Sequence, residues 1–488
     1  MSTYGSIPAD TKKTSSKREW SVEPFTSNGI RSLPKQKGVL PPFISAEVCV
    51  ILYAFIYSVI STIQVQYVDY IERLDSDTLE PETCANESSS EEYDIQMRVN
   101  FIVLGFVVSS SLTSFFTVPI ISQFSLHIGY KWGLVINLIS LLVSCCIWLI
   151  SVSLQTSYWW LVVAQFVQGL GGGVAGAQAL ATAYLSLLFD AYHLTKRLAV
   201  TGALSQLSMG SAQLLVGYAI SEYNFTTSFI IVTLVSTALT VYTAAYIKHI
   251  PPNASDTTGR DIFRKIKLLI KENSTTENRE LALICLVLCA HWSIIRSSVV
   301  LAILYIVSYP LCWESERVGC FLALLFGLGS IGPLLVFFGT IPDLYLSLLG
   351  IASSGIFVIF CAFGYSSELM FIGASVSMFR AIVGAALLAY LSKMYSHPRS
   401  KVVLAIAGCS IAVAEVIAPG IFQTIYGFTL HISTSITFFF MFFIYAPCAL
   451  IIGIYAGLIP TSCSNPGNDQ DELQSEDTED ILLLAEKC

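Results

Sequence analysis

The chain has 488 residues, of which 54% are hydrophobic and only 12% are charged, and its mean hydropathy is +0.67. A soluble globular protein carries about 25% charged residues, so this composition excludes an ordinary water-soluble enzyme. The formal net charge of −8 leaves no basic excess to neutralise phosphates, which excludes a typical nucleic-acid binder. The acidic excess is concentrated in residues 68–98 and 464–488, whereas residues 1–42 are net basic.

Taken in chain order, the apolar residues form twelve stretches that are long enough to cross a membrane. A helix needs about 20 apolar residues to span the hydrocarbon core, which is about 30 Å thick. The sequence therefore predicts an all-α membrane protein with twelve transmembrane helices. The expected spans are 44–67, 99–121, 132–152, 158–182, 199–220, 226–247, 281–307, 317–338, 344–364, 369–391, 402–427 and 434–458.

The positive charges orient these spans, because Lys and Arg accumulate in cytoplasmic loops. With the N-terminus inside, 21 of the 26 Lys and Arg residues fall in inner segments. Only Arg73, Arg98 and Arg317 fall in outer loops. Both termini are therefore expected to be cytoplasmic.

The polar segments divide the spans into two halves of six. Such halves are typical of secondary transporters, in which they rock around a binding site at the membrane midplane. The two terminal segments are expected to be largely disordered, because they lack apolar residues to bury. The expected regions are an N-terminal cytoplasmic segment 1–43, a first half 44–247 with an outer loop 68–98, a basic cytoplasmic loop 248–280, a second half 281–458, and an acidic cytoplasmic tail 459–488.

Several motifs give this layout a family resemblance. The most specific is SYPLCWESERVG at Ser308–Gly319, and others are GIFQTIYGFTL at Gly420–Leu430, LSK at Leu391–Lys393 and the pair Gln66–Tyr67. Over about residues 44–458 the chain resembles the major facilitator superfamily and, within it, solute carrier family 46, which includes the proton-coupled folate transporter and lysosomal relatives. The resemblance implies the major facilitator fold and a proton-driven carrier for organic anions.

The resemblance does not extend to folate as the substrate. Family members that carry folate place an acid early in span five, a His in span seven and an Arg just before the LSK motif. The corresponding residues here are Gly202, Ile295 and Leu388. The substrate is therefore expected to be a different organic anion.

Three charged residues lie within spans, where an ionisable group is a functional hypothesis by default. Arg296 in span seven and Arg380 in span ten are candidates for binding anionic substrate groups, with a structural ion pair to Glu415 as the alternative. Glu415 in span eleven is the candidate proton-coupling residue. Pro419, four residues later, cannot donate a hydrogen bond to the Glu415 carbonyl, so this acid sits beside a free acceptor at an expected kink.

Four further polar residues are candidates for the transport path. His291 is a candidate proton relay, and a packing histidine is the alternative. Glu47, at the start of the first span, is a coupling candidate or a residue marking the membrane boundary. Gln66 and Gln168 are candidate substrate-binding amides, which otherwise bond between helices.

No motif in the chain indicates an enzyme. Gly171, Gly173 and Gly176 match the spacing of a dinucleotide-binding fingerprint, but they lie within a membrane span with no preceding strand. Close helix packing explains these glycines better. The chain lacks a metalloprotease, hydrolase or P-loop motif, so no cofactor is expected, and the proton is the only coupling ion.

The predicted outer loops contain candidate modification sites. Asn86 and Asn224 lie in N-x-S/T patterns on the outer face and are candidate glycosylation sites. Cys84 and Cys312 also fall in outer loops, where an oxidising compartment permits a disulfide. The family resemblance implies that these two cysteines are joined.

The C-terminal tail contains a candidate sorting signal. Glu479 precedes Leu483 and Leu484 with the spacing of an acidic dileucine motif, which sorting adaptors bind. This motif favours an endosomal or lysosomal membrane, with the plasma membrane as the alternative.

These observations together predict a proton-coupled symporter that moves a small organic anion toward the cytosol. A transporter-like receptor or scaffold that binds a ligand without net transport is the alternative. The expected partners are the anion, the lipid bilayer and a sorting adaptor, with no nucleic acid. The sequence does not indicate the oligomeric state, the proton stoichiometry or the identity of the anion.

Overall fold

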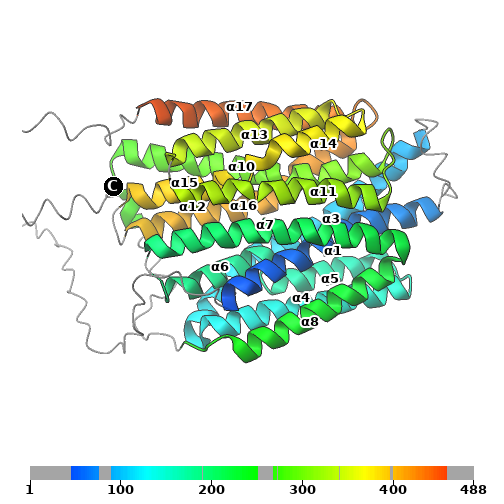
Figure 1. The fold of residues 1–488 in the computed structure, drawn as a ribbon, viewed down its shortest axis with the longest axis horizontal. Coiled ribbons are helices and arrows are strands. Elements are labelled where there is room, and N and C mark those ends of the chain that lie inside the picture. The colour runs from blue at the N-terminus through cyan, green and yellow to red at the C-terminus, as the bar shows by residue number, and fades with distance from the viewer. Residues whose placement is uncertain are drawn as a thin grey trace, which may run out of the picture. The chain divides into compact units, whose positions relative to one another are not determined.

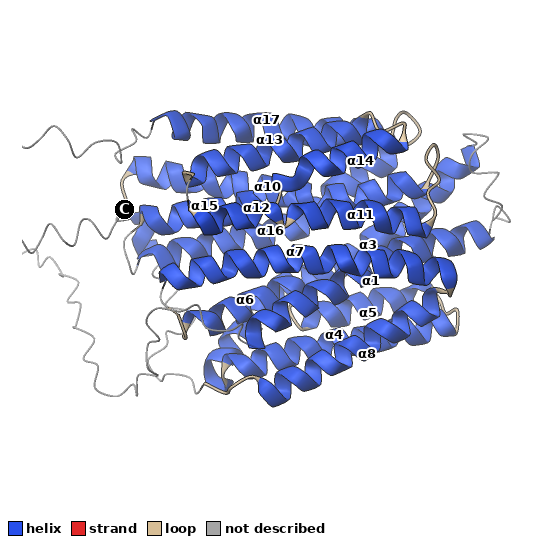
Figure 2. Ribbon diagram, in the orientation of Figure 1, coloured by secondary structure: helices blue, strands red, loops and turns tan. Residues whose placement is uncertain are grey.

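A computed structural model describes residues 45–75, 90–189, 191–250, 267–271, 273–339, 341–395 and 399–458. The regular structure of these residues is helical throughout, with no strand among them (Figure 2). The all-α fold predicted from the sequence is confirmed. The helices are α1 (Ser45–Asp75), α3 (Ser90–Ile128), α4 (Tyr130–Ser153), α5 (Tyr158–Leu170), α6 (Gly173–Ser186), α7 (Ala191–Glu222), α8 (Phe225–Tyr246), α10 (Thr275–Val307), α11 (Ser315–Gly329), α12 (Ile331–Phe338), α13 (Asp343–Ala362), α14 (Ser367–Val376), the 3-10 helix η1 (Ser377–Phe379), α15 (Ile382–Met394), α16 (Arg399–Thr429) and α17 (Ser435–Leu458).

The helices run side by side and correspond to the twelve expected spans (Figure 1). We call α1 to α8 the N-half and α10 to α17 the C-half. Eleven of the described spans are long and apolar enough to cross a membrane, and α7 is not among them. The reason is its polar middle, where Ser205, Gln206, Ser208 and Gln213 lower the hydropathy. α7 packs against both α1 and α11, so it lies between the halves.

The predicted outer loop 68–98 is helical at both ends, because α1 and α3 extend beyond the expected spans. Ion pairs link these helical extensions. Arg73 Nη2 lies 2.6 Å from a Glu92 carboxylate oxygen, and Arg98 Nε lies 2.8 Å from one of Glu72. Paired charges allow the helices to continue where apolar residues run out. We call this end of the bundle the outer end, following the orientation predicted from the sequence.

Three expected spans are each divided between consecutive helices. Span four divides between α5 and α6, where Gly172 and Gly173 have positive φ angles of 89° and 55°. Span eight divides between α11 and α12, just before Pro333, which cannot donate a backbone hydrogen bond. Span ten divides between α14 and α15, through η1 and Arg380. Of the three breaks, only the one in span eight lies beside a proline in the sequence.

Two of these breaks are bridged by a side chain from the preceding span. Asn137 of α4 donates hydrogen bonds to the carbonyl oxygens of Gly171 and Gly173, at 2.6 and 2.9 Å. In the C-half, Ser353 of α13 donates to the carbonyl oxygen of Val376 at 2.7 Å. Backbone groups inside a membrane need partners within the protein. Each half therefore satisfies the break in its fourth span with a polar residue of its third.

The halves contact each other closely toward the outer end. There α7 and α11 pack backbone to backbone, because a Cβ on Gly217 would lie 3.1 Å from the Cα of Gly319. On another side of the bundle, α3 meets α16, where Asn100 Nδ2 donates to the carbonyl oxygen of Gln423 at 2.8 Å. Small residues permit the first contact and amide hydrogen bonds hold the second, as is usual between helices in lipid.

Candidate functional site

Arg296, Glu415 and Tyr57 form a polar cluster near the middle of three spans. Arg296 Nε lies 3.9 Å from Glu415 Oε1, and Arg296 Nη2 donates a hydrogen bond of 2.5 Å to the Tyr57 hydroxyl. The guanidinium also lies over the Tyr57 ring, 5.1 Å from its centroid. Tyr57 belongs to α1, whereas Arg296 and Glu415 belong to α10 and α16, so the cluster joins the N-half to the C-half.

The ion pair in this cluster is loose and accessible. A charge-assisted hydrogen bond between nitrogen and oxygen measures about 2.7–2.9 Å, so the 3.9 Å separation leaves room for another partner at either group. The side chains of Arg296 and Glu415 are 30% and 19% exposed. α16 continues through Pro419 without interruption, and the Glu415 carbonyl therefore lacks its usual helical donor.

Arg380 lies in the break of span ten and is enclosed by aromatic rings. Its side chain is buried, with the residue 3% exposed, and its guanidinium lies 5.1 and 6.0 Å from the ring centroids of Phe326 and Phe357. Its Nη1 has no hydrogen-bond partner among the residues that the structure describes. A charged residue at the bilayer centre costs about 2.5–3.5 kcal/mol, so this guanidinium is retained at a substantial energetic penalty.

His291 is buried beside the backbone of Arg380. Its Nδ1 lies 3.4 Å from the Tyr445 hydroxyl, and the two rings are tilted with centroids 5.9 Å apart. Both residues belong to the C-half, in α10 and α17. These contacts suit a packing histidine, and the relay role remains a prediction.

Glu47 pairs with Arg197 of α7 instead of joining the central cluster. Arg197 Nη1 donates to Glu47 Oε2 at 2.7 Å, and Glu47 is completely buried. The Arg197 guanidinium also covers the Phe189 ring, with 4.3 Å between the guanidinium carbon and the ring centroid. This pair ties α1 to α7 at the predicted inner end. A structural tie is the simplest role for such a pair, and coupling by Glu47 remains a prediction.

The two candidate amides are buried in the N-half. Gln66 of α1 has no hydrogen-bond partner for either amide atom among the described residues, and the same holds for the Gln168 Nε2 of α5. Gln168 lies near the Tyr53 hydroxyl. Buried amides without partners suit a ligand-binding surface, because an unsatisfied polar group is costly.

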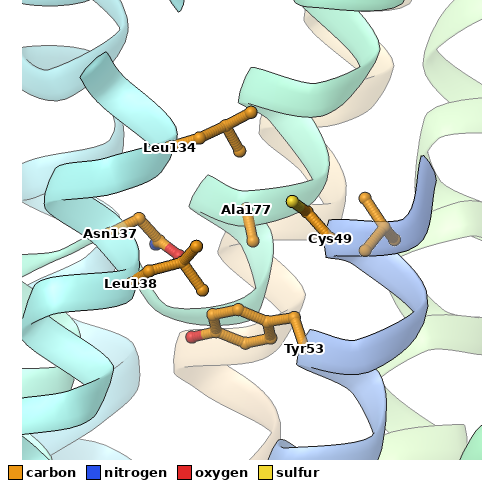
Figure 3. Close-up of a pocket in the computed structure, with 7 residues that line it drawn as sticks. Cys49, Tyr53, Leu134, Asn137, Leu138 and Ala177 are labelled. Atoms are coloured by element: carbon orange, nitrogen blue, oxygen red, sulfur yellow. The ribbon is translucent and has the colours of Figure 1, made fainter. Parts of the chain in front are cut away.

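A narrow pocket lies between α1, α4 and α6 (Figure 3), and one of its lining residues is Tyr53, whose hydroxyl lies near Gln168. Its lining is mostly apolar, with Tyr53 and Asn137 as the polar members. Asn137 also bridges the break in span four, so the pocket adjoins a point where the helix direction changes. The lining residues are Cys49, Val50, Tyr53, Leu134, Asn137, Leu138 and Ala177.

Several predicted sites lie outside the described residues. These are Cys84, Asn86, Glu479, Leu483 and Leu484.

Two of the predicted outer sites are described. Cys312 precedes α11 and is not one of the free cysteines of the described chain, and its pairing with Cys84 remains a prediction. Asn224 is exposed at the start of α8, where its side chain accepts a hydrogen bond of 2.8 Å from the Thr227 N–H. Asn224 thus caps α8, and its glycosylation remains a prediction.

Two residues beside the candidate site were not identified from the sequence. Tyr57 contacts Arg296, and Gln206 of α7 has a buried Oε1 with no partner among the described residues. Tyr57 gives no signal by itself, because aromatic residues are common in apolar spans. Gln206 does give one, since an amide in the middle of a span that is rich in polar residues indicates a face turned away from lipid.

The helix arrangement and the central polar cluster define the class of this protein as a membrane transporter. The family model described as Major Facilitator Superfamily matches residues 48–341. The chain belongs to that superfamily, whose members are transporters and not enzymes. The superfamily resemblance inferred from the sequence is confirmed.

Distant homologues of the chain among the curated proteins are members of solute carrier family 46. The chain is 22% identical to the proton-coupled folate transporter of Rattus norvegicus, over 78% of this chain and 84% of the relative. It is 22% identical to the lysosomal proton-coupled steroid conjugate and bile acid symporter SLC46A3 of Bos taurus, over 90% of this chain and 98% of the relative.

Solved structures support the fold. The structure of the human organic anion transporter MFSD10 (TETRAN) matches with a TM-score of 0.61 at 13% identity, over 84% of this chain and 99% of that one. An auto-inhibited peptide transporter of the POT family matches with a TM-score of 0.59, also at 13% identity, over 85% of this chain and 96% of that one. At these identities the likeness concerns the fold alone.

Proposed function

We propose that this protein is a proton-coupled symporter that moves a small organic anion toward the cytosol by alternating access. The observation that carries the proposal is the loose Arg296–Glu415 pair, which is accessible and is tied to the other half through Tyr57. The names of the relatives support it, since one is a proton-coupled folate transporter and another a proton-coupled symporter of steroid conjugates and bile acids. The proposed substrate class is an amphipathic anion such as a steroid conjugate or a bile acid. Folate is not proposed, because Gly202, Ile295 and Leu388 stand where folate carriers have an acid, a His and an Arg.

The cluster provides a direct route to coupling. When a proton from the acidic side neutralises Glu415, Arg296 loses its carboxylate partner and becomes free to bind the anionic group of the substrate. After the halves rock, the proton leaves toward the less acidic cytosol. Glu415 then competes again for Arg296 and displaces the anion. Proton and anion therefore bind together and leave together, which defines symport.

The other candidate residues have supporting roles in this scheme. Arg380, Gln66 and Gln168 provide buried polar groups that a bound anion would satisfy. His291 is the proposed proton relay within the C-half, beside Tyr445. The rocking of the halves is expected at the helix breaks described above.

The proposal is tested by the uptake of a tritiated steroid monosulfate into vesicles that are acidic on the outside. We expect uptake to collapse when the proton gradient is removed. Glu415→Gln is expected to abolish the pH dependence, because a neutral amide can neither pair with Arg296 nor exchange a proton. Glu316→Gln, which changes an exposed carboxylate at the start of α11, is the matched control. Full pH-dependent uptake by the Glu415→Gln variant contradicts the coupling role.

The same assay separates transport from ligand binding without transport. A receptor or scaffold would bind the steroid sulfate but would not accumulate it inside the vesicles. Accumulation above the level of empty vesicles is therefore required for the symporter proposal.

The compartment is proposed to be a lysosomal or endosomal membrane, with the proton gradient driving export from the acidic lumen. The support is the dileucine motif at Leu483 and Leu484 and the lysosomal name of one relative. In that orientation the lumen faces the outer end, where a Cys84–Cys312 disulfide and a glycan at Asn86 or Asn224 are proposed. The plasma membrane remains the alternative destination.

A further inference from the structure

Arg296 is held by two residues from opposite halves, and the closer of the two is not the charged one. Its Nη2 donates a hydrogen bond of 2.5 Å to the Tyr57 hydroxyl, whereas its Nε lies 3.9 Å from Glu415 Oε1. A guanidinium ordinarily prefers a carboxylate, with which it forms short and often bidentate hydrogen bonds. The two distances are therefore the reverse of what the charges alone favour.

Tyr57 contacts the guanidinium in two ways, which explains how it competes with a carboxylate. Its hydroxyl accepts the hydrogen bond, and its ring lies against the guanidinium with 5.1 Å between the guanidinium carbon and the ring centroid. That separation is within the range of a cation–π contact. Because Tyr57 belongs to α1, the Arg296 side chain is positioned from the N-half, whereas Glu415 belongs to the C-half.

The ion pair between Arg296 and Glu415 needs only a small movement to close. The distance from Nε to Oε1 exceeds that of a charge-assisted hydrogen bond by about 1 Å. Both side chains are partly exposed, at 30% and 19%, and an arginine side chain has several rotatable bonds. Without the Tyr57 hydroxyl, the guanidinium is therefore expected to approach the carboxylate.

In the described chain, no second carboxylate lies in the middle of the helices around this pair. The titratable groups that act on Arg296 are Tyr57 and Glu415, and α16 packs against α3, α10, α15 and α17. The titratable groups in the middle of these helices are His291, Cys285 and Cys289 of α10, Tyr445 and Cys448 of α17, and Arg380 just before α15. Those toward the helix ends are Glu92, Tyr93, Asp94, Arg98 and His127 of α3, Glu277, Arg279, Glu280 and Tyr305 of α10, Tyr390 and Lys393 of α15, and Tyr455 of α17.

We propose that Tyr57 is a positioning residue, which holds Arg296 away from Glu415 and so keeps the Glu415 carboxylate open to a proton. This inference rests on the proposed function, in which a proton on Glu415 frees Arg296 for the anion. A close ion pair favours the ionised form of a carboxylate, so a tighter pair requires a higher proton concentration before the anion can bind. The contact crosses from one half to the other, and it therefore changes when the halves rock.

The test removes the hydroxyl and keeps the ring. Tyr57→Phe deletes the hydrogen-bond acceptor and leaves the ring against the guanidinium. Tyr70→Phe is the matched control, because it makes the same change in the same helix at a residue that is 41% exposed. The measurement is the uptake of a tritiated steroid monosulfate by the full-length protein in proteoliposomes, at varied outside pH and a fixed inside pH. The quantity compared is the midpoint, the outside pH at which uptake is half-maximal.

We expect Tyr57→Phe to lower this midpoint by about one pH unit, which is about a tenfold higher proton concentration. A hydrogen bond between charged groups is strong enough to cause a shift of this size. Tyr70→Phe is expected to keep the midpoint of the unchanged protein. An unchanged or higher midpoint in Tyr57→Phe overturns the inference, even where uptake falls at every pH, because a purely structural role lowers uptake without moving the midpoint.

A binding measurement covers the case in which Tyr57→Phe does not transport. Equilibrium binding of the same monosulfate to the purified protein in lipid nanodiscs, over the same pH range, gives a midpoint that does not depend on turnover. The same acid shift is expected there, and a loss of binding at every pH overturns the inference. Uptake that does not depend on pH in the unchanged protein overturns the proposed function, whereas pH-dependent uptake with an unmoved Tyr57→Phe midpoint overturns the role of Tyr57 alone.

Discussion

Separating Glu47 from Arg197 is expected to destabilise the protein strongly, whereas replacing both together is not. The pair is almost inaccessible, with side chains 0% and 4% exposed, and the two charged groups approach to 2.7 Å. Arg197→Leu leaves the Glu47 carboxylate buried without this guanidinium. Glu47→Leu leaves the guanidinium buried without this carboxylate.

The magnitude follows from the burial of both partners. Removing one partner of a buried ion pair costs about 3–5 kcal/mol, and each single variant is expected in that range. Arg197→Leu additionally loses the guanidinium contact with the Phe189 ring, which contributes about 0.5–2 kcal/mol. Glu47→Leu/Arg197→Leu removes both charges, and an apolar replacement of a buried pair is often neutral or stabilising. The double variant is therefore expected to lie close to the unchanged protein.

The assay is SDS-induced unfolding of the purified protein in mixed micelles, with the free energy of unfolding measured for all four members of the cycle. A coupling energy of about 6 kcal/mol or more is expected, because each single variant loses about 3–5 kcal/mol and the double variant almost nothing. Thermal unfolding in detergent is a second readout. Single-variant effects that add within about 0.5 kcal/mol would refute the reasoning, since they would show that the two residues do not depend on each other.

Three further predictions concern the break in span four and the two ends of the chain. Asn137→Leu removes the donor to two backbone carbonyls, and the loss is expected to lower the free energy of unfolding by about 1–3 kcal/mol; an unchanged unfolding curve would contradict this bridge. Peptide mapping by mass spectrometry without reduction is expected to find Cys84 and Cys312 in one linked peptide pair, and two free thiols would end that assignment. Leu483→Ala/Leu484→Ala is expected to raise the fraction of protein labelled by surface biotinylation several-fold, and an unchanged surface fraction would show that the motif is not read.

The sequence predicts the helical content and the twelve spans well, because both depend on long apolar stretches. It also anticipates the proximity of Arg296 and Glu415, since a charge within a span needs a partner and few are available. The helical ends of the 68–98 segment were missed. There the helices are prolonged by ion pairs such as Arg73–Glu92, which hydropathy does not detect.

The breaks in spans four and ten were also missed, for a different physical reason. Gly172 and Gly173 permit a positive φ, but glycines inside a span serve helix packing equally well. A helix break inside a membrane is stable when a neighbouring helix donates a hydrogen bond to the backbone carbonyl that the break leaves free, as Asn137 and Ser353 do. That donor becomes visible only when the spans are placed beside each other.

The bridges from Asn137 and Ser353 have a mechanical consequence. Each one joins the middle of a fourth span to the third span of the same half by hydrogen bonds. We therefore expect the third and fourth spans of a half to move together. A tilt of span four must carry span three with it, or else expose two carbonyl oxygens to hydrocarbon. In the N-half, the Asn137 amide donates two hydrogen bonds to the fourth span. In the C-half, the Ser353 hydroxyl donates one hydrogen bond to the fourth span and accepts another from the Phe379 N–H. The two halves therefore hold their third and fourth spans together with different hydrogen bonds, and the energy needed to separate these spans is expected to differ between the halves.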